Sequence, residues 1–259
     1  MSIADVRPGL PLAHVNPVAK VASTVPLSIA LLLTLDPVSA AVAIVCEVVI
    51  FTAVGLGSLL WSARTLPVWI AAPLTGLSML LYGAPSGAVY LDVGLIHVTE
   101  GSVQIALATT ARVIAIALPA VVLFLTIDPT DLADGLAQTL RLPARFVLGA
   151  LAALRLAGTS IDDWRTISLA RRARGVADRG RLLRFAGQAF ALLVLAVRRG
   201  STLATAMEAR GFGAPVRRTW AREVVFGGRE WAVIAVGCLV AVASVVAAVA
   251  AGTWNLVWS

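Results

Sequence analysis

The chain of 259 residues is 59% hydrophobic and 14% charged, and its 21 basic and 14 acidic residues give a formal net charge of +7. Soluble domains are roughly 45–50% apolar and about 25% charged, so this composition argues against an ordinary soluble protein and favours a membrane protein. The two cysteines, Cys46 and Cys238, lie in apolar runs without CxxC spacing. We expect buried small apolar side chains there, and no disulfide or zinc site.

Several apolar runs are long enough to cross a bilayer, which takes roughly 20 residues of helix. The five candidates cover about residues 18–35, 38–60, 66–84, 103–127 and 231–251. Asp36-Pro37 separates the first two and fits a tight turn at the membrane surface. A signal peptide is the alternative for the start of the chain, but the stretch before the apolar core is too long for one.

Basic residues indicate the orientation, because lysine and arginine collect on the cytoplasmic side of membrane proteins. Of the 21 basic residues, those outside residues 128–230 are Arg7, Lys20, Arg64 and Arg112. We therefore expect residues 128–230 to be cytoplasmic. The loop 85–102 has no lysine or arginine and is expected outside. The sequence predicts a cytoplasmic N-terminus, five crossings and an external C-terminus.

Residues 128–230 are too long and too regular for a simple loop, and we expect about three helices in them. Asp128 can cap a short first helix, and Pro129 fits its first position. Two longer patterns cover about residues 143–174 and 181–210 without an internal proline, each about 45 Å if fully helical. Both are apolar on nearly all sides and basic at their ends, so we expect them at the inner leaflet. A shallow hairpin through the membrane is the alternative.

The predicted fold class is therefore all-α, a polytopic membrane protein with about five transmembrane helices and about three cytoplasmic or membrane-surface helices. Residues 1–127 form the transmembrane bundle and residues 128–230 the cytoplasmic region. Residues 231–259 form the last transmembrane helix and an outer tail.

Two charged residues fall inside the predicted spans. Glu47 in the second span and Arg112 in the fourth both lie roughly 13 Å below the outer start of their helix. Charges at that depth are costly unless they are paired or hydrated. We therefore expect a Glu47–Arg112 salt bridge that holds the bundle together; the alternative is that the two side chains lie at different depths.

Both long helices of the cytoplasmic region end in the same tripeptide. The two copies are Ala173-Arg174-Gly175 and Ala209-Arg210-Gly211. Glycine commonly follows a helix C-terminus, and arginine in the last turn interacts favourably with the helix dipole. One copy would need no explanation beyond capping. Two copies at the ends of consecutive helices favour a function, with capping as the alternative.

These paired tripeptides resemble the signatures of the EcfT family, the transmembrane coupling components of energy-coupling factor transporters. The resemblance covers most of the chain. The segment "HVNPVAK", residues 14–20, is similar to the family's Asn-Pro-x-x-Lys motif, and residues 111–136 resemble its fourth span and the segment after it. Arg155-Leu156-Ala157 stands where the family often has Arg-Phe-hydrophobic-Pro, which leaves the packing of that helix open.

The resemblance implies a scaffold that joins two cytoplasmic ABC-type ATPases to a small membrane protein that captures substrate, the S component. Arg174 and Arg210 would each dock in a groove of one ATPase, and a guanidinium suits an acidic or carbonyl-lined groove. We also expect S-component contacts from apolar residues that would otherwise serve plain packing: Phe185, Phe190, Leu192, Leu193 and Leu195.

The implied process is uptake of a vitamin, a vitamin precursor or a transition-metal ion across a bacterial or archaeal cell membrane. The S component would select the substrate, so this sequence does not name it. The chain itself would be no enzyme and would bind no cofactor, with ATP and magnesium held by the ATPases. Consistent with this, it has no G-x-x-x-x-G-K-[ST] motif and its only lysine is Lys20.

Two other classes of function stay open on the residues alone. A membrane-embedded enzyme would need a group of catalytic residues, and the carboxylate pair Asp162-Asp163 is the one candidate for such a group. We expect these two residues to form a solvated acidic face of a helix instead. A stand-alone transporter needs polar residues along a path through the membrane, and these are sparse. The basic region borders apolar helices, so we expect anionic lipid or protein as its contact, and no nucleic acid or metal.

Overall fold

The computed structural model describes residues 12, 15–34, 36–83, 86–93, 96–175, 180–214 and 219–254. The chain divides into two compact units. One unit, Met1–Leu132 with Val225–Ser259, is called the bundle here. The other, Ala133–Val224, is called the insert. The insert falls within residues 128–230, for which the sequence predicts a cytoplasmic location.

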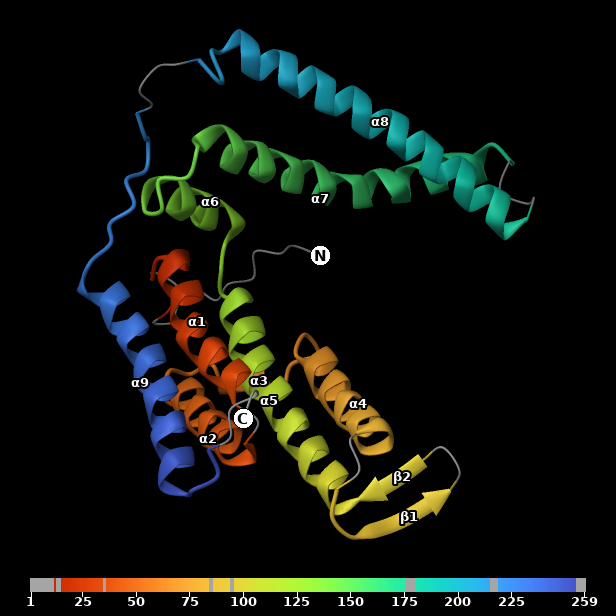
Figure 1. The fold of residues 1–259 in the computed structure, drawn as a ribbon. Coiled ribbons are helices and arrows are strands. Elements are labelled where there is room, and N and C mark those ends of the chain that lie inside the picture. The colour runs from red at the N-terminus through yellow and green to blue at the C-terminus, as the bar shows by residue number, and fades with distance from the viewer. Residues whose placement is uncertain are drawn as a thin grey trace. The chain divides into compact units, whose positions relative to one another are not determined.

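The bundle is built mainly from helices (Figure 1). They are α1 (Pro17–Leu33), α2 (Pro37–Ala53), α3 (Gly57–Leu60), α4 (Leu66–Tyr82), α5 (Glu100–Phe124) and α9 (Gly228–Ala250). Their bounds agree with the five predicted spans to within a few residues, except that the second span ends early. Gly55 has φ +82°, a conformation that glycine adopts without strain, and it separates α2 from the single turn of α3.

Capping residues set the starts of the first two bundle helices. The Asn16 side chain accepts a hydrogen bond from the Val18 N–H at 2.9 Å at the start of α1. Asp36 does the same for the Ser39 N–H at 2.7 Å at the start of α2. A proline follows each cap, where its missing N–H costs nothing. The Asp36-Pro37 turn expected from the sequence is thus a helix N-cap.

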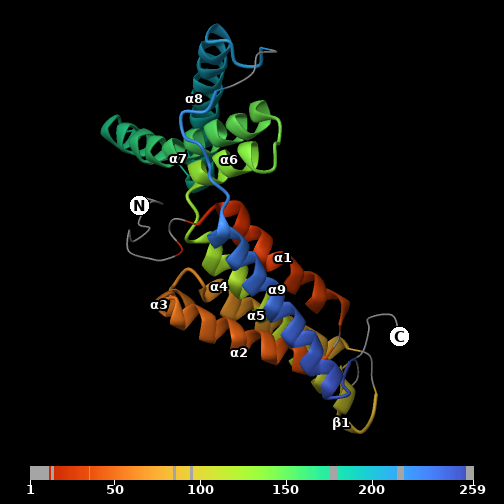
Figure 2. The same cartoon turned by 90° about the vertical axis from the view of Figure 1, so that its left-hand side faces the viewer.

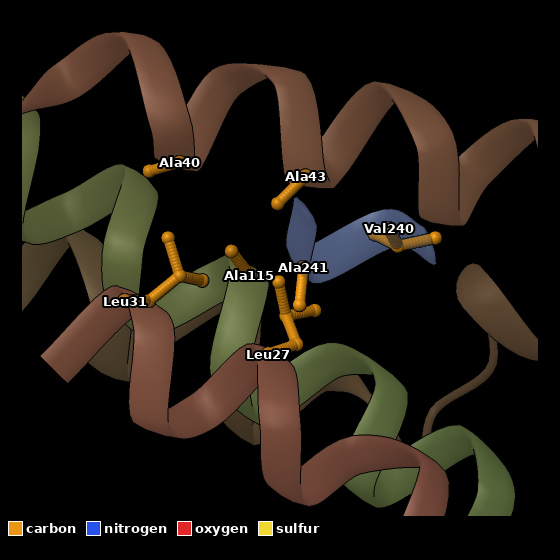
Figure 3. Packing of buried hydrophobic residues seen from close by; sticks show 7 residues of the cluster. All are labelled: Leu27, Leu31, Ala40, Ala43, Ala115, Val240 and Ala241. Atoms are coloured by element: carbon orange, nitrogen blue, oxygen red, sulfur yellow. The ribbon is translucent and has the colours of Figure 1, made fainter. Parts of the chain in front are cut away.

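Small side chains let the bundle helices approach closely. A buried apolar cluster joins α1, α2, α5 and α9. Figure 3 shows its residues between these helices: Leu27, Leu31, Ala40, Ala43, Ala115, Val240 and Ala241. At Gly237 in α9, a Cβ atom would overlap the Ser23 carbonyl of α1. Such small-residue contacts are typical of helices that pack inside a membrane.

A β-hairpin interrupts the otherwise helical fold, and the sequence analysis missed it. Strands β1 (Val89–Val93) and β2 (Ile96–Thr99) pair antiparallel within the expected external loop. Their β-branched valine, isoleucine and threonine residues favour strands. Thr99 then caps α5 in a reciprocal pair of hydrogen bonds with Ser102, so the hairpin leads directly into the longest helix of the bundle.

Helix length and composition support a polytopic membrane protein. Among the described residues, α5, α9 and the insert helices α7 (Ala144–Ala173) and α8 (Arg181–Ala209) are long and apolar enough to cross a membrane. The apolar helices α1, α2 and α4 have 17 residues each, at the lower limit of the roughly 17–25 residues that a span needs. The thiol of Cys238 is exposed on α9 and that of Cys46 half-buried on α2, so Cys238 is not buried as expected.

The insert has a small core and a long crossing pair of helices. Residues of α6 (Pro129–Gln138) pack on the start of α7 through Ala133, Ala137 and Val147. The Gln138 side chain donates to the Arg222 carbonyl at 2.8 Å and accepts from the Val224 N–H at 2.9 Å. This amide fixes the returning chain beside α6. Beyond this core, α7 and α8 cross each other (Figure 2), and most of their side chains are exposed.

Candidate functional site

The two Ala-Arg-Gly tripeptides end α7 and α8 with the same backbone conformation. Arg174 has φ −89° and ψ 3°, and Arg210 has φ −92° and ψ 12°. The glycines that follow, Gly175 and Gly211, have φ +66° and +76°. This left-handed conformation is the usual one for a glycine just beyond a helix end.

Backbone hydrogen bonds close both helix ends without help from the arginines. The Gly211 N–H donates to the Glu208 carbonyl at 2.9 Å, and the Phe212 N–H donates to the Met207 carbonyl at 2.9 Å. These two bonds form a Schellman motif. In α7 the Gly175 N–H donates equivalently to the Arg172 carbonyl at 3.0 Å. The glycines therefore act as caps, as the structural alternative predicted.

The arginine side chains remain available for a partner. Arg174 and Arg210 are exposed, and within the described part of the chain neither guanidinium forms a hydrogen bond or an ion pair. The chain stops its helix immediately after each arginine, so each charge lies at a helix tip. Figure 1 shows these tips at opposite ends of the α7–α8 pair.

An ion pair joins α7 to α8. Arg199 donates to both carboxylate oxygens of Asp163, with Nη2 and Oδ1 3.0 Å apart. The two residues are 36 positions apart in the chain, as are Arg174 and Arg210. Each arginine tip therefore lies eleven residues beyond the ion pair, about 16 Å along its helix. The two tips therefore lie equally far along their helices from the ion pair.

The five expected S-component contacts have different environments on α8. Phe185, Phe190 and Leu193 are exposed, whereas Leu192 and Leu195 are half-buried. Phe185 also packs on Trp164 of α7, with ring centroids 5.4 Å apart. The outward-facing part of this set is thus smaller than the sequence suggested.

An open groove of about 950 Å³ lies between the start of α7 and the end of α8. Its walls include the basic side chains of Arg145, Arg155 and Arg210 beside apolar ones such as Leu148 and Met207. The groove could not be predicted from the sequence, because it depends on how the two helices pack on each other. It places Arg210 at the edge of a hollow that is both basic and apolar.

The Asn-Pro-x-x-Lys motif forms a buried polar cluster at the start of α1. Lys20 is 1% exposed, and its ammonium donates to the Thr126 carbonyl at 3.1 Å and to Thr126 Oγ1 at 3.2 Å. The Asn16 N–H donates to Glu230 Oε1 at 3.4 Å. The motif thus links α1 to the end of α5 and the start of α9. His14 lies outside the described residues.

The expected Glu47–Arg112 salt bridge is wrong. Arg112 donates to the Thr34 carbonyl at the end of α1 and interacts electrostatically with Asp36. Glu47 lies ten residues after Pro37, about 15 Å further along the helix. Equal distances from the helix starts did not bring the two groups together, because the long arginine side chain reaches toward the turn between α1 and α2.

The carboxylate pair that suggested an enzyme faces arginines. Asp163 binds Arg199, and Asp162 lies 3.7 Å from Arg165. Over the described residues, no group of three or more His, Cys, Asp or Glu side chains could hold a metal ion.

Comparison with known proteins agrees with the tripeptides and the helix pattern. The family model described as CbiQ, cobalt transport protein, matches residues 10–220. The energy-coupling factor transporter transmembrane protein EcfT of Brevibacillus brevis is 32% identical over 201 residues, 73% of each chain. The chain belongs to the EcfT family.

Further EcfT relatives support this assignment. The protein from Limosilactobacillus fermentum is 30% identical over 194 residues, 70% of this chain and 72% of its own. The EcfT protein from Bacillus subtilis is 29% identical over 160 residues, which are 57% of this chain and 60% of that protein. The family match includes α1 to α8 and ends before α9. This EcfT chain is therefore a multi-pass membrane protein of a transporter family, and the resemblance drawn from its motifs is confirmed.

Proposed function

We propose that the chain is the coupling subunit of an energy-coupling factor importer and joins two cytoplasmic ATPases to a substrate-capturing S component. The observation that carries the proposal is a pair of exposed arginines, each without a partner among the described residues and each eleven residues beyond the Asp163–Arg199 ion pair. A single exposed arginine at one helix end could be explained by its interaction with the helix dipole alone. Two matched tips suit two related ATPase subunits.

Each arginine would enter a groove on one ATPase. A guanidinium carries five donors in a rigid fork and stays charged, so it binds carboxylates and backbone carbonyls well. The glycine after it ends the helix, which leaves room for the ATPase to close around the tip. ATP and magnesium would be bound by the ATPases, and this chain would carry out no hydrolysis.

The S component would contact the outward apolar side chains of α8, of which Phe185, Phe190 and Leu193 are exposed. Motion that ATP binding causes at the tips would reach the S component through the crossing helices. The substrate would be a vitamin, a vitamin precursor or a transition-metal ion, and the matching family model is described as a cobalt transport protein. The insert would lie on the cytoplasmic side.

Copurification tests this proposal directly. Tagged full-length chain is solubilised from its own membranes, and wild type is compared with the double variant Arg174→Glu/Arg210→Glu. Wild type should bring down two ABC ATPase subunits and a small membrane protein. The double variant should lose roughly tenfold or more of the ATPase, which corresponds to about 1.4 kcal/mol of binding free energy.

The matched control is Arg165→Glu/Arg198→Glu, which reverses two other exposed charges on the same helices and should retain the ATPases. If the tip variant retains them as well, the tripeptides serve only as helix caps. If wild type brings down no ATPase, the coupling proposal fails as a whole.

A further inference from the structure

A half-open cavity of about 220 Å³ lies between helices of the bundle and takes no part in the proposed coupling. Its walls come from α1, α2, α5 and α9. Most of the lining side chains are apolar, such as Leu27, Phe51 and Val236. One charged residue, Glu47 of α2, also lines it.

Glu47 is buried without a partner. Glu47 is 4% exposed. Neither of its carboxylate oxygens has a hydrogen-bond partner among the described residues. Arg112, the cation that the sequence suggested for it, binds Thr34 instead. A buried carboxylate that nothing compensates is costly, and an ionisable group at membrane depth commonly marks a functional site.

The other polar groups of the cavity wall are Ser23 and Thr24 of α1. The Ser23 hydroxyl donates its hydrogen to the Lys20 carbonyl at 2.7 Å, and the Thr24 hydroxyl donates to the Val21 carbonyl at 2.8 Å. A hydroxyl that has given its one hydrogen to the helix backbone offers only lone pairs to a ligand. When Glu47 is ionised, its carboxylate and these two hydroxyl oxygens are all acceptors, and they form a small polar part of an otherwise apolar wall.

We propose that this cavity binds a small amphiphilic amine, with its ammonium group against Glu47 and its apolar body against the bundle helices. An ammonium group carries three donors and a positive charge, which match the carboxylate and the two hydroxyl oxygens. A calcium-like metal ion would need about six to eight oxygen ligands, more than this wall supplies. A neutral apolar molecule would leave the carboxylate unpaired.

Binding would connect four helices of the bundle, and it does not depend on the coupling function. A ligand that binds only the folded state raises the unfolding temperature in a concentration-dependent manner. Benzylamine is a suitable probe, since its ring and single ammonium group reproduce the two halves of the cavity. Benzyl alcohol has the same apolar body without the charge.

The experiment measures thermal unfolding of the purified full-length chain in detergent. Benzylamine should raise the unfolding temperature of wild type saturably, and benzyl alcohol or sodium chloride at equal concentration should not. Glu47→Gln should weaken the benzylamine effect at least about tenfold, and Thr24→Val severalfold, because each removes an acceptor. Glu208→Gln, a neutralised exposed carboxylate on α8, should respond like wild type.

A second measurement avoids the risk that Glu47→Gln fails to fold. A lipid-soluble carbodiimide joins a bound primary amine to a neighbouring carboxyl group as an amide, and mass spectrometry locates that amide in wild type. The amide at Glu47 should form at low benzylamine concentration and saturate, whereas the amide at exposed Glu208 should rise in proportion to concentration. Equal behaviour of the two carboxylates would overturn the proposal. So would an equal temperature shift from benzyl alcohol, or a shift from sodium chloride alone.

Discussion

At each tip of the α7–α8 pair, glycine and arginine have separate roles. Gly175 and Gly211 take the left-handed conformation that ends the helix, and the neighbouring arginine contributes only backbone to that end. The sequence predicted the caps, because capping preferences are local properties of a few residues; the docking of the arginines on ATPases stays a prediction. The sequence did not predict that the two tips lie equally far from an ion pair, since that depends on contacts between distant segments.

The cap at Gly211 can be tested by Gly211→Ala. An alanine at φ +76° carries a steric cost of roughly 1 kcal/mol, so the last turn of α8 should open more often. Amide hydrogen exchange at residues 211 and 212 should accelerate roughly fivefold. Gly200→Ala is the control, because that glycine has no neighbouring atom within 4 Å of an added Cβ and lies inside α8. Unchanged exchange in Gly211→Ala would contradict the cap.

Buried charges were the least predictable residues. Depth along a helix suggested that Glu47 and Arg112 meet, yet Arg112 binds the Thr34 carbonyl and Glu47 lines a cavity. Depth does not specify which face of a helix a residue occupies or where a long side chain reaches. Lys20 gave a better signal: as the only lysine in the chain and within an apolar run, it needed a buried partner, which is Thr126.

At the scale of helices, apolar runs located most elements well. Turn residues and caps at Asn16-Pro17 and Asp36-Pro37 set helix starts that can be read from the sequence. The β1–β2 hairpin and the break after α2 could not be read in the same way. The hairpin depends on strand pairing across a turn. The break after α2 depends on one glycine, Gly55, within a continuous apolar run.

The close approach of α1 and α9 predicts the effect of Gly237→Ala. The added methyl group would overlap the Ser23 carbonyl, and a backbone atom in a packed helix cannot move away cheaply. Overpacking of this kind costs about 1–3 kcal/mol, so the free energy of unfolding in detergent should fall by that amount. Gly228→Ala, at the start of α9 with no atom within 4 Å of the new Cβ, should change it little. Equal stabilities of the two variants would refute the close contact.

The Asp163–Arg199 ion pair predicts a defined distance between the helix tips. Their side chains are 17% and 41% exposed, so the pair should contribute about 1 kcal/mol, at the upper end for such pairs. Asp163→Asn should broaden the distance distribution between spin labels at Ala173 and Ala209, measured by electron-spin resonance. Asp163→Arg/Arg199→Asp should narrow it again. Asp162→Asn, which removes only a contact within α7, should leave it unchanged, and similar broadening there would argue against the ion pair.

For the whole molecule, charge and apolar length predicted a transmembrane bundle and a cytoplasmic insert. The structure separates residues 133–224 from the rest as a compact unit, and the membrane topology stays a prediction. The position of α7 and α8 is harder to predict, because both helices are also long and apolar enough to cross a membrane. Composition alone therefore permits either a surface pair or a crossing hairpin. The distribution of basic residues favours the surface pair.

Cysteine labelling can decide the topology. In a chain with Cys46 and Cys238 replaced by alanine, a membrane-impermeant maleimide should label Thr253→Cys in intact cells, since that residue follows α9 on the predicted outer side. Leu182→Cys, highly exposed at the start of α8, should react only after permeabilisation. Reaction of Leu182→Cys in intact cells would show that α7 and α8 cross the membrane as a hairpin.

The position of the Asp163–Arg199 ion pair divides each long helix into a short arm, which ends at the arginine tip, and a longer arm, which ends at the opposite end of the helix. From the Asp163–Arg199 ion pair, each arginine tip is about 16 Å away, whereas the opposite ends of α7 and α8 are about 27 to 28 Å away. For stiff helices that pivot at the ion pair, a displacement at the tips grows roughly 1.7-fold at the far ends, by the ratio of these lengths. Force would fall by the same factor, so helices that pivot in this way would convert a short, strong movement at the tips into a longer, weaker one at the far ends.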